Sequence, residues 1–119
     1  MEATLLKNHS LQWVVIKDPK TDHYHYLLIT DYRASKKEAI AYFLRHSALK
    51  RPLIVAGDDY NDKESLEFGD VRVVMENAPP SLKASADILA PVAKHHGVIQ
   101  GLNQAIELCQ KEDFTQRWE

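Results

Sequence analysis

The 119-residue chain carries 15 basic and 17 acidic side chains, a formal charge of −2, and 45% apolar residues. This length fits one domain with one core of ordinary proportions. The charges form no block of either sign, which excludes the basic footprint of a nucleic-acid-binding protein and a polybasic membrane anchor. The apolar runs are far shorter than the ~20 residues that cross a bilayer, and no export signal is visible. The single cysteine, Cys109, excludes an internal disulfide, so we expect a soluble protein of the reducing cytoplasm.

Two strand-like segments open the chain. Residues 11–17 are rich in β-branched and aromatic types and stop at residues 18–22, which have the composition of a turn. A second such segment, residues 24–29, follows at once. Two strands joined by a short polar turn predict an antiparallel hairpin.

From Ser35 the period becomes that of a helix. Apolar residues recur at steps of three and four on one face, with Ser35 as the N-cap; they are Ala39, Ile40, Phe43 and Leu44. This helix is expected to end near Lys50, ahead of Pro52. Residues 53–56 then predict a short, wholly buried strand of a parallel sheet covered by helices on both faces.

The remaining segments alternate between helix and strand. We expect a short helix over residues 62–68 closed by Gly69, which can take the left-handed conformation that helix ends favour. A strand over 71–75, a short helix from Pro79 through Ala86 and a last strand over 87–89 should follow. A C-terminal helix should bury Cys109 on an apolar packing face that comprises Val98, Leu102, Ala105, Ile106 and Cys109. The alternation predicts an α/β fold built from βαβ units.

The acidic loop at residues 57–62, Gly-Asp-Asp-Tyr-Asn-Asp, follows the strand predicted at 53–56. Open α/β sheets bind ligands outside the carboxyl ends of their strands. Asp58, Asp59 and Asp62 offer the hard oxygen ligands that Mg²⁺ takes, and such an ion would neutralise phosphate charge and stabilise an in-line displacement. The alternative is an ordinary strand-to-helix turn in which Asp and Asn cap backbone N–H groups.

Several segments between residues 35 and 98 occur in one characteristic order. They are residues 35–40, residues 52–62, residues 73–83, Ala86-Asp87 and His96-Gly97-Val98. Together they resemble the C-terminal part of the phosphatases of the haloacid dehalogenase (HAD) superfamily, and most closely the Cof-type branch, which has a large α/β cap. The resemblance implies a partial Rossmann-like core, a parallel sheet with flanking helices, over residues 35–119. Residues 1–34, with the hairpin, resemble the closing strands of the cap.

The resemblance also implies roles for individual residues. Lys36 matches the family's lysine, which steadies the nucleophile and the phosphoryl group, and Asp58 matches the acidic magnesium ligand. Asn61 and Asp62 would complete the metal and phosphate environment. The implied cofactor is Mg²⁺.

Two further positions are implied less directly. Asp59 is a third candidate metal ligand, at a position where many members carry a small polar residue. Asn77 lies in a loop that resembles one lining the family's phosphate and substrate pocket. The implied substrate is a small phosphorylated molecule.

The family's chemistry depends on an Asp-x-Asp motif followed by Thr or Val, whose first Asp attacks phosphorus. No Asp-x-Asp occurs in these 119 residues, so we expect a phosphatase fragment that is inactive alone. A competing alignment places Asp18-Pro19-Lys20-Thr21 at the nucleophile position. Lys20 would then replace the general acid and base, but an ammonium group cannot accept a proton from water at neutral pH. The hairpin is therefore the preferred interpretation of this segment.

In the family, the strand that carries the nucleophile lies beside the strand that here is residues 53–56. Without it, that strand would expose an edge of unpaired N–H and C=O groups. We therefore expect a homo-oligomer, a strand-swapped dimer or a complementing chain. The alternative function is a non-catalytic interaction or oligomerisation module that retains the fold.

Three other features of the sequence allow more than one interpretation. His23 and His25 alternate on one side of the second strand and could share a transition metal, but no third ligand is suggested, so we interpret them as solvated strand residues. Tyr60 either gates the pocket or packs beside the loop. Trp118 either anchors a partner or folds back on the core.

Overall fold

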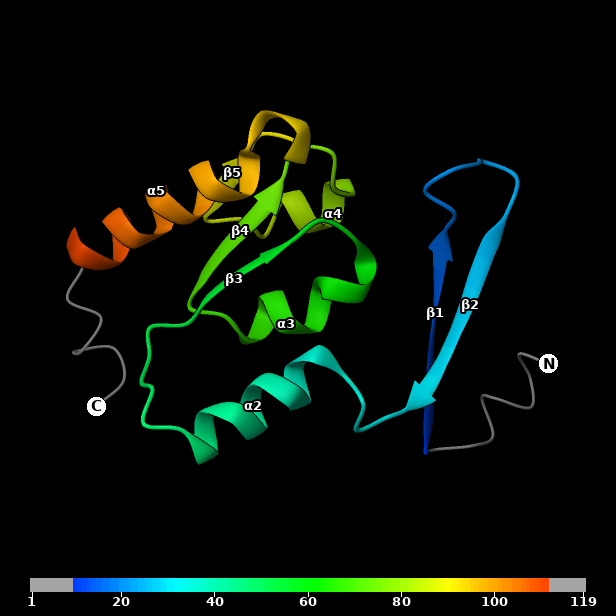
Figure 1. The fold of residues 1–119 in the computed structure, drawn as a ribbon, viewed down its shortest axis with the longest axis horizontal. Coiled ribbons are helices and arrows are strands. Elements are labelled where there is room, and N and C mark those ends of the chain that lie inside the picture. The colour runs from blue at the N-terminus through cyan, green and yellow to red at the C-terminus, as the bar shows by residue number, and fades with distance from the viewer. Residues whose placement is uncertain (1–9, 112–119) are drawn as a thin grey trace.

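The structure, a computed structural model, describes residues 10–111, with the side chain of Ala93 left aside. Figure 1 shows a β-hairpin standing beside an α/β body. The hairpin pairs β1 (Leu11–Lys17) with β2 (His25–Asp31) in antiparallel register, so that Val14 lies opposite Leu28. The predicted hairpin is confirmed. Trp118 lies outside the described residues, so its role stays a prediction.

Helix α2 (Lys36–His46) leads from the hairpin to the body. Ser35 caps it as predicted, since its Oγ accepts a hydrogen bond from the backbone N–H of Glu38 at 3.1 Å. The helix ends at His46 and not near Lys50. The next residue, Ser47, is extended and its Oγ accepts from the N–H of Leu49 at 3.3 Å, a local bond that competes with helix continuation.

The α/β body is built on a three-stranded parallel sheet in the order β3-β4-β5. Its elements, in chain order, are β3 (Ile54–Gly57), the 3-10 turn η1 (Tyr60–Asp62), α3 (Lys63–Phe68), β4 (Val71–Met75), α4 (Pro80–Lys83), β5 (Ile88–Ala90), the 3-10 turn η2 (Ala93–His95) and α5 (Gly97–Lys111). The predicted class, a parallel α/β sheet with flanking helices behind an antiparallel hairpin, is confirmed. Among the described residues, no helix has the length and apolarity needed to span a bilayer.

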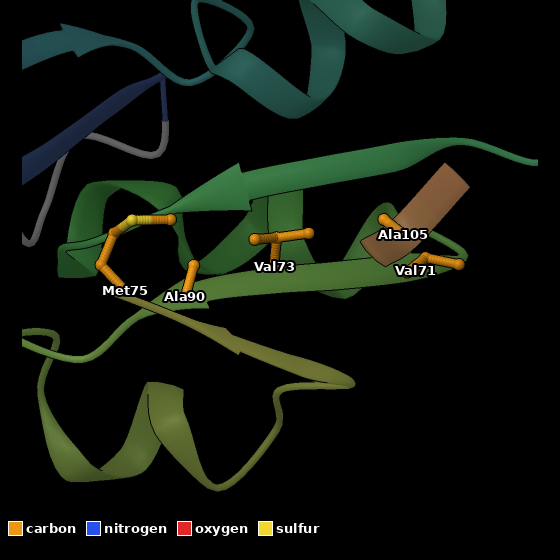
Figure 2. Close-up of a cluster of buried hydrophobic side chains, with 5 residues drawn as sticks. All are labelled: Val71, Val73, Met75, Ala90 and Ala105. Atoms are coloured by element: carbon orange, nitrogen blue, oxygen red, sulfur yellow. The ribbon is translucent and has the colours of Figure 1, made fainter. Parts of the chain in front are cut away.

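The core lies on the two faces of this sheet. Successive side chains of a strand point to opposite faces, so the middle strand β4 contributes to both layers. Val71, Val73 and Met75 pack with Ala90 and Ala105 beneath α5 (Figure 2). On the other face, β3 and β4 side chains pack against α3 and α4; that cluster comprises Val55, Leu66, Val74, Ala78 and Leu82.

Helix α5 packs on the sheet through small residues. Gly97, Gly101 and Ala105 are its buried positions. A Cβ added at Gly101 would lie 2.5 Å from Cγ1 of Val73 and 2.8 Å from Cβ of Ala90, so only glycine permits this approach. The predicted packing face was therefore partly wrong: Val98 and Ile106 are 40% and 46% exposed.

Other predictions also need correction. Residues 53–56 were expected to be wholly buried, but only Val55 is, because β3 is an edge strand of the sheet in the described part of the chain. Gly69 closes α3 as predicted, but with a φ of −72° it does not use the left-handed conformation that glycine allows. It is needed for space, since an added Cβ would lie 2.8 Å from Cγ2 of Val55. Cys109 is half-buried at the margin of the α5 cluster rather than fully buried.

Candidate functional site

The acidic loop joins β3 to α3 at the carboxyl edge of the sheet, where parallel strands place ligand-binding loops. Gly57 lets the loop fold back on itself. A Cβ added there would lie 2.6 Å from Cβ of Asp62, so a larger residue would push the loop open. The close approach of these two positions brings Asp62 beneath the backbone of Asp58 and Asp59.

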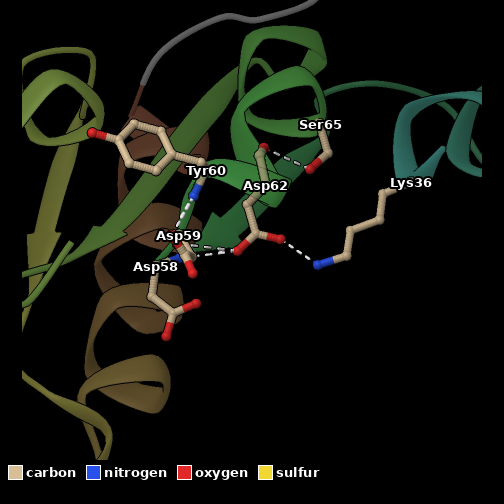
Figure 3. Close-up of polar contacts among 6 residues, drawn as sticks. All are labelled: Lys36, Asp58, Asp59, Tyr60, Asp62 and Ser65. Atoms are coloured by element: carbon tan, nitrogen blue, oxygen red, sulfur yellow. Dashed lines mark hydrogen bonds and ion pairs between the residues drawn. The ribbon is translucent and has the colours of Figure 1, made fainter. Parts of the chain in front are cut away.

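Asp62 is the centre of the loop (Figure 3). Its side chain is only 9% exposed. Oδ2 accepts from the backbone N–H groups of Asp58 at 3.1 Å and Asp59 at 3.5 Å, while Oδ1 accepts from the Nζ of Lys36, which reaches it from the start of α2. Ser65 Oγ donates to the backbone carbonyl of Asp62 at 2.8 Å. Both carboxylate oxygens are thus used to shape the loop and to fix Lys36.

Asp59 caps the turn that follows. Its Oδ1 accepts from the N–H of Tyr60 at 2.7 Å, and Asp59 and Asp62 form a reciprocal capping box around η1. The turn interpretation of the loop therefore describes Asp59 and Asp62 well. It does not account for Asp58, whose carboxyl group belongs to neither cap.

Asp58 is exposed in a strongly acidic setting. Partial desolvation raises the pKa of its carboxyl group, and the carboxylates of Asp62 and Asp59 raise it further, while the Lys36 ammonium opposes them. Asp58 and Asp62 also lie close enough to share a hydrogen bond when Asp58 is protonated. Two adjacent carboxyl groups with one lysine to balance them are a donor set that suits a hard divalent cation.

A cavity of about 610 Å³ opens in front of Asp58 and Asp59. Asn77, which follows β4, lines the same cavity, because neighbouring parallel strands end at the same edge of the sheet. The turn of the hairpin forms the opposite wall with Lys17, Asp18 and Asp22, together with Pro19. Three of the predicted site residues therefore meet here.

Lys36 and Asn61 line a second cavity of about 250 Å³ between the hairpin, the start of α2 and η1. Gln12 and Thr30 contribute from the hairpin, and the Nε2 of Gln12 donates to Oγ1 of Thr30 at 3.2 Å. The side chain of Lys36 is about half exposed. It contacts Asp62, whose other carboxylate oxygen accepts from the backbone of Asp58 and Asp59, and these two residues line the first cavity. Tyr60 is exposed on this side of the loop.

The sequence does not predict that residues of the hairpin line the two cavities. The sequence of this segment indicates a polar turn after a strand. It does not indicate that the turn faces the acidic loop across a cavity. Asp18 itself is a turn residue: its Oδ1 accepts from the N–H of Lys20 at 2.8 Å and its Oδ2 from the hydroxyl of Tyr26 at 3.1 Å. His23 and His25 are exposed, and the described residues contain no group of three or more histidine, cysteine or acidic side chains gathered as metal ligands.

Comparison with known proteins identifies the class. Residues 4–102 match the family model of haloacid dehalogenase-like hydrolases, so the chain belongs to this family. A comparison with curated proteins found no match.

Solved structures show the same fold. A haloacid dehalogenase-like hydrolase from Bacillus subtilis is 25% identical with a TM-score of 0.65, covering 81% of this chain and 32% of its own. A Thermotoga maritima protein is 30% identical with a TM-score of 0.56, covering 72% and 31%. A haloacid dehalogenase-like hydrolase from Bacteroides thetaiotaomicron is 23% identical with a TM-score of 0.62, covering 78% and 34%. The chain spans about a third of the length of the structures it matches.

Proposed function

We propose that this chain supplies the lysine and magnesium part of a phosphohydrolase site that acts on small phosphorylated molecules. The observation that carries the proposal is the contact network of Asp62, which holds Lys36 on one side and the backbone of Asp58 on the other. The buried carboxylate of Asp62 thus holds the Lys36 ammonium group and the backbone of Asp58 at the carboxyl edge of a parallel sheet. The ammonium group suits a phosphate, and the Asp58 carboxyl group suits the metal ion that accompanies it.

In this proposal each residue has a distinct task. Asp58 is the metal ligand, supported by its exposed carboxyl group in an acidic setting. Asp62 positions Lys36, whose ammonium group offsets phosphate charge. Asn61 and Asn77 are neutral hydrogen-bonding groups at the rims of the two cavities.

Family membership implies Mg²⁺, which HAD proteins generally use. Asp58 would hold the ion, with Asp62 beside it and Asp59 as a further candidate ligand. When bound, the ion would polarise phosphoryl oxygens and offset their charge. The close pair of Asp58 and Asp62 fits this role, because a divalent cation would relieve the repulsion that raises the pKa of Asp58.

The nucleophile is proposed to come from elsewhere, because the 119 residues contain no Asp-x-Asp sequence. The open edge of β3 is the place where a complementing strand would join the sheet. We propose that the chain by itself hydrolyses phosphate esters slowly or not at all. Its single cysteine and balanced charge suit a cytoplasmic setting.

The second candidate is a non-catalytic interaction module, favoured by apolar side chains that α5 leaves exposed. On α5, Val98, Ile99 and Ile106 are 40%, 61% and 46% exposed. A partner strand or a second copy would cover such a surface. Light scattering at high concentration tests the self-association version: a strictly monomeric chain would count against it.

Thermal unfolding with Mg²⁺ and inorganic phosphate separates the two candidates. Ligands at about 100 times their dissociation constants would stabilise a real site by ~2.7 kcal/mol, which corresponds to roughly 10 °C in a domain of this size. We expect Asp58→Ala to remove the shift. Glu67→Gln, which removes one exposed charge from the neighbouring α3, should keep it. No shift in the unsubstituted chain favours the interaction module.

Hydrolysis of p-nitrophenyl phosphate tests the missing nucleophile. We expect no turnover above the uncatalysed rate for the purified chain with Mg²⁺. Magnesium-dependent turnover that Asp58→Ala abolishes would overturn the claim that the chain is inactive alone, while it would support the assignment of Asp58.

A further inference from the structure

One face of the hairpin forms a wall of the second cavity. Val14 and Leu28 are register partners, and so are Gln12 and Thr30. Because successive side chains of a strand point to opposite faces, these four side chains share one face of the hairpin. All four residues line the cavity. The hairpin therefore presents an apolar pair beside a neutral polar pair to the space in which Lys36 also lies.

The polar pair is oriented by one hydrogen bond. Nε2 of Gln12 donates to Oγ1 of Thr30 at 3.2 Å, and both residues are half-buried. This bond leaves Oε1 of Gln12 as an acceptor and the hydroxyl hydrogen of Thr30 as a donor. Neither side chain has another hydrogen-bond partner among the described residues. A donor beside an acceptor matches a hydroxyl group, because a hydroxyl group both accepts and donates.

We infer that the second cavity receives the organic group of the substrate, and that this group is small, uncharged and hydroxylated. The inference rests on the proposed function, in which Lys36 offsets the charge of the phosphate. Lys36 lines the second cavity and not the first. A hydroxyl group of the substrate contacts Gln12 and Thr30, while its carbon atoms pack on the apolar pair. Gln12 and Thr30 are thus specificity-determining residues.

The first cavity, in front of Asp58 and Asp59, suits the metal ion instead. Asp18 also lines it, and the oxygens of Asp18 accept only from neutral groups, a backbone N–H and a tyrosine hydroxyl. Among the described residues that line this cavity, Lys17 is the one with a basic side chain, and it is paired with Asp22 at 2.6 Å. The other carboxylates of this wall therefore keep their negative charge, which favours a cation.

The volume and the charges of the second cavity limit the organic group. The volume of about 250 Å³ equals that of about eight water molecules in the liquid. Sites for drug-sized ligands have ~300–1,000 Å³, so a chain of a few carbon atoms fits here and a nucleoside does not. Lys37 and Glu64 also line the cavity and carry opposite charges. They give no preference for a further charge on the substrate.

Two phosphate esters with the same carbon chain test the inference on the whole chain in the presence of Mg²⁺. Glycerol 1-phosphate carries two hydroxyl groups that propyl phosphate lacks. We expect it to bind about five- to tenfold more tightly, the gain expected from a neutral hydrogen bond. The affinities follow from the dependence of the melting temperature on ligand concentration. Equal affinities, or tighter binding of propyl phosphate, would overturn the inference.

Inorganic phosphate separates this outcome from a failure of the proposed function. If inorganic phosphate binds and the two esters do not differ, the inference alone is wrong. If inorganic phosphate does not bind, the proposed function is wrong, and the inference is wrong with it.

Substitutions at Thr30 locate the contact. Thr30→Val keeps the branched shape and removes the hydroxyl group, so we expect it to lower the affinity for glycerol 1-phosphate to that for propyl phosphate. Thr30→Ser keeps a hydroxyl group and should retain the preference. Thr21→Val makes the same change in the turn of the hairpin, outside the lining of either cavity, and serves as the control. An equal loss in the control, or an unchanged preference in Thr30→Val, contradicts the assignment.

Two further variants keep the test decisive. Gln12→Met removes the amide at nearly the same side-chain length, and we expect the same loss of preference; it provides the measurement if Thr30→Val does not fold. Asp18→Asn reports on the first cavity. If Asp18→Asn removes the preference and the substitutions at Gln12 and Thr30 do not, the organic group lies in the first cavity and the inference is wrong.

Discussion

The two halves of this molecule differ in what holds them together. Residues 10–50, which form the hairpin and α2, contain no buried residue, while every buried side chain described lies between Val55 and Ala105. The radius of gyration is 16.3 Å, whereas a compact domain of this length would have one of about 13.5 Å. The body folds around its own core. The hairpin and α2 carry exposed apolar side chains, such as Tyr42 at 60% and Phe43 at 58%, and add no buried residue to that core.

This contrast suggests that stability should depend on the body alone. The largest effect is expected at Gly101, where α5 meets the sheet. Gly101→Leu would force a side chain into Val73 and Ala90, and we expect a loss of about 3 kcal/mol or a failure to fold. Urea unfolding followed by circular dichroism measures it. Gln104→Leu, on an exposed position of the same helix, serves as control; an equal loss there would show that packing against the sheet is not the cause.

The next effect is expected at a buried ion pair of the body. Asp70 is 1% exposed in its side chain, and its carboxylate accepts from Arg51 and from the N–H of Leu53, both at 2.6 Å. Asp70→Ala leaves these donors without this acceptor and should cost about 2 to 3 kcal/mol.

The hairpin offers a matched control for that substitution. Asp31 pairs with Arg33 at 3.0 Å on the surface. Surface ion pairs contribute little, so we expect Asp31→Ala to leave the urea midpoint of the body unchanged. A comparable shift for both variants would contradict the division between the two halves.

A smaller effect is expected in the acidic loop. Asp62→Asn keeps the shape of the side chain but weakens the contacts to Lys36 and to the N–H groups of Asp58 and Asp59, so we expect a loss of about 1 to 2 kcal/mol. Chemical denaturation measures the change. Asp59→Asn should be nearly neutral, because Asn caps a turn about as well as Asp. Equal losses would mean that Asp62 does not organise the loop.

The smallest effect is expected on α2. Phe43 is 58% exposed, and Phe43→Ala should change stability by less than about 0.5 kcal/mol. A fully buried aromatic residue would cost about 3 to 5 kcal/mol. Differential scanning calorimetry of the variant makes the comparison, and a loss of more than 2 kcal/mol would show that α2 is buried in solution by a contact such as self-association.

Much of the fold was predictable from local patterns. The strands predicted at 11–17 and 71–75 have the bounds of β1 and β4, and the strand predicted at 24–29 differs from β2 by one or two residues at each end. These strands are predictable because runs of β-branched residues between turn residues define strands locally. Ser35 was recognised as an N-cap by its position ahead of the helical period. The helix predicted to run through Ala86 ends at Lys83, and the last strand begins one residue later than predicted, at Ile88.

The candidate site was predictable as a set of residues but not as an arrangement. The residue types of the acidic loop singled out Asp58, and the resemblance to the family singled out Lys36 and Asn77. They did not show that Asp62 is buried and divides its two oxygens between Lys36 and the loop backbone. The division between residues 34 and 35 stays a prediction, as do the individual roles of the site residues.

By itself, the sequence determined the order of the elements, the parallel α/β class and the family motif, because these depend on side-chain periodicity and on short stretches of residue types. Only the tertiary structure decided which face of α5 packs, that β3 lies at an edge, and that the turn of the hairpin faces Asp58 across one cavity. Those features depend on contacts between residues far apart in the chain. Gly101 is an example: the sequence does not show why glycine is needed at this position, because the need arises from its close contact with Val73 on β4.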